Sequence, residues 1–277
     1  MVAWREQRRT EGYSPFTLRC YDIQLRLLAR NIGDKPIEEI TLLDLRGYIG
    51  GKASEGRKAS TIAHRVRMVR SFFTWCVEED VLARSPAHKL REPKQPQRIP
   101  KALSFDELEL IRDSCKTVRE HALVEFLFAS GGRAMEVSNI KQADIDWNRR
   151  CLVVMGKGSK EREVYFNAKA ALWMKRYLDK REDDCEYLFT NGKGFKHRLS
   201  PHQIWWAVKQ VANRCGLREK VHPHSFRHTM ATAMLNGGAE LSAVQSILGH
   251  EKPETTQLYA QLSGKRRQEQ YNRYMPQ

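Results

Sequence analysis

The chain has 277 residues, of which 41% are hydrophobic and 29% charged, with a formal net charge of +15. This length predicts one large or two medium domains, each able to bury a core. No apolar run approaches the ~20 residues of a membrane helix, and the first residues lack a signal peptide's apolar stretch, so we expect a cytoplasmic protein without a membrane partner. The excess of Lys and Arg favours a polyanionic ligand. Because residues 1–100 and the remainder are both basic, a nucleic acid that contacts both halves fits best.

The residues that could bind a metal ion show no metal-binding spacing. The six cysteines are scattered and include no C-x-x-C pair, which argues against a zinc ribbon or a disulfide framework. Three imidazoles lie in His222-Pro-His224-Ser-Phe-Arg-His228, but no cysteine or acid is spaced to complete a zinc site. We therefore expect neither a metal nor another cofactor.

Residues 1–92 are predicted to form a helical bundle. Ser14, followed by proline, and Thr41 have the capping chemistry of helix starts, and Asp44 stands where a capping-box acid would. A third helix is expected from about Ser60, with apolar residues at helical spacing. Its other faces carry three arginines: Arg65, Arg67 and Arg70.

A linker over residues 93–101 separates this bundle from a second domain, residues 102–277. Three prolines within eight residues prevent a helix there and stiffen an extended segment. Ser104 and Glu107 form a capping box that opens the second domain. Helices are then expected at 121–130, 201–214, 225–236 and 241–248, and two strands, 151–155 and 163–166, form a hairpin. The sequence thus predicts a mainly α protein, with a small β-hairpin in an α+β second domain.

Six residues of the second domain combine into a phosphate-binding and nucleophilic set. Taken singly, each has an ordinary explanation: a capping pair between Arg133 and Glu136, a solvated turn lysine, or a core or surface tyrosine. Together they offer several cationic or imidazole donors to a phosphodiester and one phenolic oxygen that can attack it. The set is Arg133, Lys157, His224, Arg227, His250 and Tyr259.

In the order and spacing of these residues the chain resembles the tyrosine site-specific recombinase family, most closely its compact Xer-type members and related mobile-element integrases. The steps from 133 to 157, 224 to 227, 227 to 250 and 250 to 259 are 24, 3, 23 and 9 residues. The phrases Gly-Lys-Gly-Ser-Lys-Glu-Arg, His-Ser-Phe-Arg-His and Leu-Gly-His are specific, and the resemblance covers nearly the whole chain. Two departures are Gly132, where a larger apolar residue is usual and a packing side chain is lost, and Asn139-Ile140, where leucines are commoner.

The resemblance implies a reaction without metal or ATP. Tyr259 would attack a DNA phosphate to form a 3′-phosphotyrosyl bond, with the 5′-hydroxyl leaving. Arg133 and Arg227 would offset charge on the phosphate, with Glu136 supporting Arg133. His224 would act as base or donor, Lys157 would protonate the leaving oxygen, and His250 would donate to the phosphate.

The resemblance also implies how the protein binds its partners. The two domains would clamp double-stranded DNA, with further contacts from Arg65, Arg67, Arg70 and Lys160. Two protomers would occupy one site and four would assemble in synapsis, with the tail 263–277 docked on a neighbouring subunit. The protein would be nucleoid-associated in a prokaryote.

Two other classes of function share parts of this pattern. A type IB topoisomerase uses the same chemistry, but the compact helical N-terminal domain and the Xer-like phrases argue against it. A non-catalytic DNA-binding regulator could keep the fold, but the intact tyrosine and basic set argue against that reading. The sequence specifies neither the DNA site nor the choice between integration, excision, dimer resolution and inversion.

Overall fold

The structure is a computed structural model that describes residues 2–54, 56–94, 102–156, 160–191 and 197–249. The chain divides into two compact units, Met1–Gln97 and Arg98–Gln277. Within the described ranges, no helix is long and apolar enough to cross a membrane.

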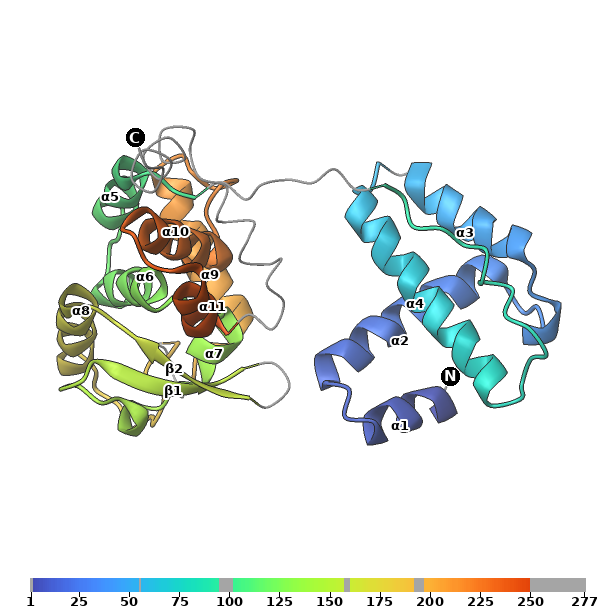
Figure 1. The fold of residues 1–277 in the computed structure, drawn as a ribbon, viewed down its shortest axis with the longest axis horizontal. Helices are drawn as coiled ribbons and strands as arrows, with labels where there is room; N and C mark the ends of the chain where they lie inside the picture. Colours follow the sequence, from blue (N-terminus) through green and yellow to red (C-terminus); the bar gives the residue numbers. More distant parts are fainter. Residues whose placement is uncertain (1, 55, 95–101, 157–159, 192–196, 250–277) are drawn as a thin grey trace, which may run out of the picture. The chain divides into compact units, whose positions relative to one another are not determined.

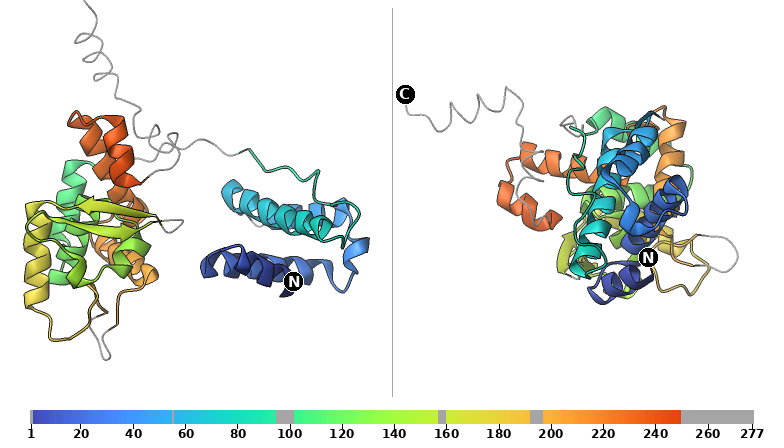
Figure 2. Two further views of the ribbon diagram at one scale, coloured as in Figure 1. Left: turned by 60° about the horizontal axis from the view of Figure 1, so that its bottom comes forward. Right: turned by 90° about the vertical axis from the view of Figure 1, so that its right-hand side faces the viewer.

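Every regular element among the described residues of the first unit is a helix (Figures 1 and 2). The long helix α4 packs against both α2 and α3, and α1 packs against α2. As predicted, Ser14 caps α2 by accepting the N–H of Thr17 at 3.2 Å, and Thr41 and Asp44 exchange backbone-to-side-chain bonds at the start of α3. The elements are α1 (Val2–Thr10), α2 (Pro15–Ile32), η1 (Ile37–Glu39), α3 (Leu42–Ser54) and α4 (Ala59–Glu78).

The arginines of α4 do not share one exposed face. Arg67 and Arg70 are exposed, and Arg67 pairs with Glu92 at 3.6 Å. Arg65, by contrast, is only 4% exposed, so the expectation that it lies on a solvent- or DNA-facing surface is wrong for this structure. The reason is that α4 is buried on most sides, with Val66, Met68 and Val69 also in the core, so a residue off the main apolar stripe is still covered.

Helix α6 is the centre of the second unit (Figure 1). It packs against α8, α9 and α10, and α11 packs against α10 and β2. The elements are α5 (Phe105–Asp113), α6 (Val118–Ser130), α7 (Ala134–Asn139), η2 (Gln142–Asp144), β1 (Cys151–Met155), β2 (Glu161–Tyr165), α8 (Ala168–Asp179), α9 (Pro201–Arg214), α10 (Pro223–Asn236) and α11 (Leu241–Leu248).

Strands β1 and β2 form an antiparallel hairpin in which Cys151 faces Tyr165 and Met155 faces Glu161. Its inner face, including Leu152, Val154 and Val164, joins the main core of this unit. The prediction of a mainly helical protein with a small hairpin in an α+β second unit is confirmed. The second strand begins two residues before its predicted start, because backbone pairing extends to Glu161 beyond the apolar pattern.

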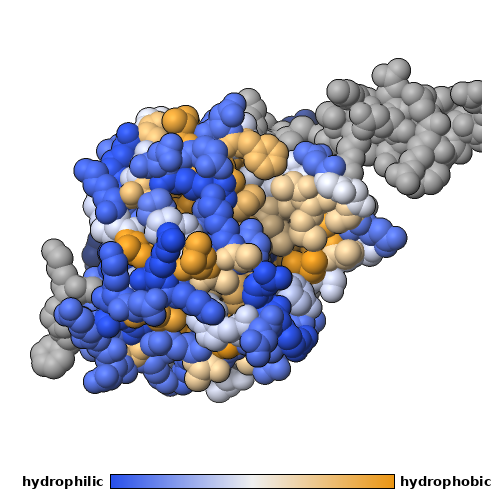
Figure 3. Space-filling view, turned by 90° about the vertical axis from the view of Figure 1, so that its left-hand side faces the viewer, coloured by the Kyte–Doolittle hydropathy of each residue, from blue (hydrophilic) through white to orange (hydrophobic). Residues whose placement is uncertain are grey.

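Hydrophilic residues predominate on the face shown in Figure 3, and the apolar side chains there gather in smaller areas between them. A strongly basic composition with a polar face of this kind suits a protein that binds a charged ligand.

Candidate active site

Two glycines end α6 and bring the chain to Arg133. Gly131 has a φ of 58°, in the left-handed region that glycine favours, and its N–H closes the helix on Leu127. A Cβ at Gly131 would lie 3.2 Å from Leu248 and from Met230, so the turn fits tightly against α10 and α11. The glycine pair therefore allows close approach of α6 to the helices that carry the rest of the site.

Gly132 has no room for the side chain that is usual in the family. A Cβ built there would come within 2.9 Å of a Val137 methyl group and 3.2 Å of the Ser130 hydroxyl. The Gly132 N–H donates to that same hydroxyl at 3.1 Å. In this chain Val137 already fills the space, so the expected loss of packing at position 132 is not seen.

Glu136 fixes the side chain of Arg133. Arg133 is the N-cap residue of α7; its backbone N–H donates to Oε2 of Glu136 and its Nη1 to Oε1, both at 2.7 Å. A second guanidinium, from Arg162 on β2, donates to Oε2 at 2.7 Å. Burial opposes ionisation of Glu136, but the Arg162 charge and the hydrogen bonds outweigh it and lower the pKa of the carboxyl. Glu136 is therefore an ionised carboxylate shared by two arginines.

Arg227 lies on α10 and is only 3% exposed. Its Nη1 donates to the Gly131 carbonyl at 2.7 Å, and its Nη2 donates to the Leu248 carbonyl. Arg133 Nη2 donates to the next carbonyl, that of Gly249, at 3.3 Å. Two guanidinium groups thus meet at the carboxyl end of α11, where the helix dipole favours positive charge.

His224 stands one helical turn before Arg227 and is exposed. Desolvation by the surrounding protein, followed by the charges of Arg227 and Arg133, lowers the pKa of His224. Burial also lowers the pKa of His222, and it lowers that of His228 to about 4. The three imidazoles are therefore neutral at pH 7, and His224 is the one that reaches solvent beside both arginines.

Three predicted site residues, Lys157, His250 and Tyr259, lie outside the described residues, as does the tail 263–277. The chain on either side of the first two is described. Gly156 donates to the Lys160 carbonyl at 2.7 Å, which closes the base of the hairpin turn, and Lys160 itself is exposed. Gly249 ends α11 in a left-handed conformation, with a φ of 62°. The described part of the site thus unites Arg133, Glu136, His224 and Arg227.

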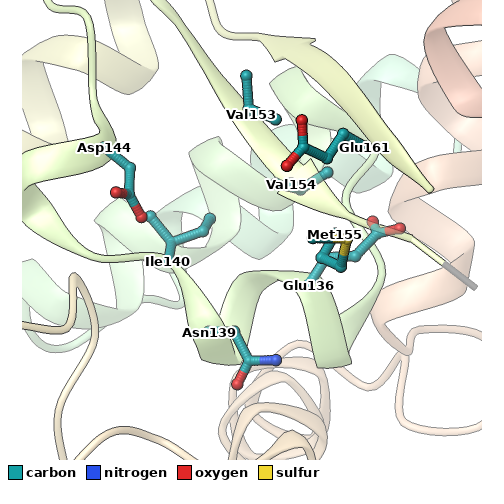
Figure 4. Close-up of a pocket in the computed structure, with 8 residues that line it drawn as sticks. All are labelled: Glu136, Asn139, Ile140, Asp144, Val153, Val154, Met155 and Glu161. Atoms are coloured by element: carbon teal, nitrogen blue, oxygen red, sulfur yellow. The ribbon is translucent and has the colours of Figure 1, made fainter. Parts of the chain in front are cut away.

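An acidic pocket of about 380 Å³ lies beside Glu136 (Figure 4). Three carboxylates line it, together with apolar side chains of β1. Its carboxylates would repel a phosphodiester, whereas the surface around Arg133 and His224 offers donors that can bind an anion. The lining residues are Glu136, Asn139, Ile140, Asp144, Val153, Val154, Met155 and Glu161.

Arg162 is the site neighbour that the sequence reasoning missed. It stands within the phrase Gly-Lys-Gly-Ser-Lys-Glu-Arg, yet its partners Glu136 and Ile247 are 26 and 85 residues away. The sequence did contain an indication of this role. Arg162 lies two residues before Val164, so both side chains lie on the face of β2 that joins the core.

Comparison with known proteins gives concordant results for both units. Residues 101–266 match the phage integrase family, and residues 4–80 match the N-terminal SAM-like domain of phage integrases. The tyrosine recombinase XerC of Corynebacterium glutamicum is 34% identical over 274 residues, which are 96% of this chain and 87% of that protein.

Two solved structures extend the comparison to the fold. The crystal structure of XerA recombinase has a TM-score of 0.57 at 28% identity, covering 99% of this chain and 96% of that one. A lambda integrase(75-356) dimer bound to a COC′ core site has a TM-score of 0.77 at 19% identity, covering 95% and 94% of the two chains. The second likeness concerns the fold alone.

Proposed function

The chain belongs to the phage integrase family, and from its site we propose that it is a site-specific DNA recombinase that cuts and rejoins duplex DNA through a phosphotyrosine. The observation that carries this proposal is the meeting of Arg133 and Arg227 at the end of α11, beside the neutral imidazole of His224. Two guanidinium groups, each able to bind two phosphate oxygens, and an imidazole that can accept a proton suit phosphoryl transfer to and from a tyrosine.

In the proposed reaction the Tyr259 oxygen attacks the phosphorus, the new P–O bond forms, and the bond from phosphorus to the 5′ oxygen breaks. The tyrosine proton passes to His224, and Lys157 gives a proton to the departing 5′ oxygen. Because the phosphotyrosyl ester keeps the bond energy, a 5′-hydroxyl can reverse the step without ATP. Arg133, Arg227 and His250 contact the non-bridging oxygens and stabilise their growing charge.

Residues 1–92 serve in this proposal as a DNA-binding domain, 93–101 as a linker and 102–277 as the catalytic domain. Arg67, Arg70 and Lys160 are exposed and are proposed to contact phosphates, whereas Arg65 is buried and is not proposed as a contact. Recombination joins two duplexes, so we propose two protomers on each site and four in synapsis. The biological setting, whether a mobile element or chromosome-dimer resolution, follows from the DNA site.

Covalent capture from a random pool tests the proposed chemistry and selects the DNA site in the same experiment. The protein is mixed with a pool of nicked duplexes of randomised sequence, and DNA that stays attached after denaturation is recovered and sequenced. We expect one enriched sequence, hereafter the recovered duplex, with the protein on a 3′ end, in the presence of EDTA. No adduct, or an adduct only with added metal, would refute the proposal. Adducts without sequence preference would instead favour a type IB topoisomerase-like enzyme.

The lowered pKa of His224 predicts how cleavage depends on pH. A base with a depressed pKa stays unprotonated further into acid, so single-turnover cleavage should remain near its plateau at pH 6.5, the ordinary pKa of histidine, and fall only below it. The His224→Gln variant should lose that acid limb and cleave about 10²-fold more slowly. A wild-type rate that already halves above pH 6.5 would contradict a depressed pKa for this histidine.

Truncation after Leu262 tests the proposed assembly. All six proposed site residues precede the cut, so the shortened chain should bind a single half-site normally and still form adducts. If residues 263–277 dock on a neighbour, it should lose cooperative binding to two half-sites and fail to recombine a plasmid that carries two full sites. Gel-shift titration of one-site and two-site DNA measures the first effect. Unchanged cooperativity would assign the tail no role in assembly.

A further inference from the structure

Arg162 connects three separate elements through one buried guanidinium. Its side chain is 9% exposed and projects from β2. Nη2 donates to Oε2 of Glu136 on α7 at 2.7 Å, and Nη1 donates to the carbonyl of Ile247 near the end of α11. One side chain thereby holds three elements together: the hairpin, helix α7, which Arg133 caps, and helix α11.

The aliphatic part of Arg162 also fills the space beside Gly249. A Cβ at Gly249 would lie 2.6 Å from Cδ and 3.2 Å from Nε of Arg162, so the two residues are in close contact. Gly249 immediately precedes His250, and its carbonyl accepts from Arg133 at 3.3 Å. Arg162 therefore supports the Gly249 turn that ends α11, one residue before His250 in the sequence.

The sharing of Glu136 gives Arg162 an effect on Arg133. Each guanidinium holds a different oxygen: Arg133 Nη1 contacts Oε1, while Arg162 contacts Oε2. If Arg162 were absent, Oε2 would keep the bond from the Arg133 backbone N–H, and the carboxylate could turn from it to take the Arg133 guanidinium in a two-point ion pair. Such a pair would draw the Arg133 guanidinium toward Glu136 and away from a bound phosphate.

Stability alone gives a poor account of this arrangement. Nε of Arg162 is buried and has no hydrogen-bond partner among the described residues, which costs free energy. Buried ion pairs also contribute little to stability compared with apolar residues of similar size. A methionine could fill the same space but would leave the buried Glu136 carboxylate and the Ile247 carbonyl without this donor, so the guanidinium serves to hold these two groups in place.

We propose that Arg162 is a positioning residue for DNA cleavage, which holds Glu136 so that Arg133 faces the phosphate and which supports the Gly249 turn at the end of α11. This rests on the proposed recombinase function. The effect is indirect, since Arg162 acts through Glu136 and the end of α11.

The test compares Arg162→Met and Arg162→Lys with a matched control, Arg149→Met, on the recovered duplex. Arg149 begins the same hairpin, is exposed and pairs with Glu163 at 3.0 Å. We expect Arg162→Met to slow single-turnover adduct formation by about 10²-fold, the cost of a small misplacement of reacting groups. Arg162→Lys keeps the charge but not the two Nη donors, so it should recover part of the rate. Arg149→Met should match wild type. Gel shift should change little in all three, whereas Arg162→Met should lower the melting temperature because the buried Glu136 and the Ile247 carbonyl each lose a donor, so the rates are compared at a temperature where every variant is folded.

A pH series separates positioning from a general structural defect. The groups that face Glu136 are Arg133, Arg162 and His224, with Asp144 and Glu161 across the acidic pocket. Without Arg162, burial raises the pKa of Glu136, so the carboxyl is protonated over a wider pH range and releases Arg133. Because the ionised carboxylate is the form that draws Arg133 away from the phosphate in this variant, the rate deficit of Arg162→Met should grow as pH rises. In a Glu136→Gln background, Arg162→Met should cause a smaller further loss, and the deficit should not vary with pH.

The outcomes distinguish this inference from the function on which it rests. Equal rates for Arg162→Met and wild type would overturn the inference and leave the recombinase proposal intact. A pH-independent deficit that tracks a fall in melting temperature would reduce Arg162 to a structural residue. Failure of the wild type to form adducts would refute the proposed function itself.

Discussion

Replacing Tyr259 with phenylalanine is expected to remove covalent capture of DNA by at least about 10⁴-fold, the scale on which loss of a nucleophile acts in other covalent enzymes. The change deletes a single oxygen, so the basic residues that bind the phosphate remain. Binding of the recovered duplex should be unchanged, with the same steep decrease as salt rises. Denaturing gels of radiolabelled DNA measure the adduct, and gel shifts at several salt concentrations measure binding.

The chain provides matched controls for this experiment in Tyr271 and Tyr274, which lie further along the same terminal region. Tyr271→Phe and Tyr274→Phe should form adducts at the wild-type rate. If either control lost the adduct while Tyr259→Phe kept it, the nucleophile would be in the tail. Mass spectrometry of the adduct peptide would then identify which tyrosine carries the nucleotide.

The elements that the sequence predicted best are those specified by local chemistry. Ser104 and Glu107 form the expected capping box at the start of α5, and Ser200 before a proline begins α9 at the predicted residue. The pair Arg133 and Glu136 is also local, three residues apart, and its contact could be anticipated. In each case a side chain bonds backbone or side-chain groups within one helical turn, so neighbouring residues determine the result.

Features that depend on tertiary packing could not be predicted from neighbouring residues in this way. Helix α6 begins three residues before its predicted start, because Thr117 caps it, and α1 and α8 were not assigned. The burial of Arg65 follows from the packing of α4 against α2 and α3. The role of Arg162 requires contacts with α7 and α11, which only the folded chain brings together.

Arg227→Gln and Arg133→Gln are expected to slow cleavage to a similar degree but to differ in stability. Each variant removes one guanidinium group from the phosphate. The loss of one preorganised donor slows a reaction by about 10²–10³-fold. Arg227 is buried and donates to the carbonyls of Gly131 and Leu248, so its loss leaves both carbonyls short of a donor. We expect the unfolding free energy of Arg227→Gln to fall by roughly 1–3 kcal/mol.

Arg133→Gln should be the milder change for the fold. The Arg133 side chain is 28% exposed, and Glu136 keeps its bond to Arg162 when Arg133 is removed. Urea unfolding followed by tryptophan fluorescence compares the two variants with wild type, and single-turnover adduct formation compares their rates at a temperature where both are folded. Equal stability of the two variants would mean that the carbonyls of Gly131 and Leu248 find other donors. A near-normal rate for Arg133→Gln would mean that Arg227 alone holds the phosphate, and the paired-arginine site would have to be abandoned.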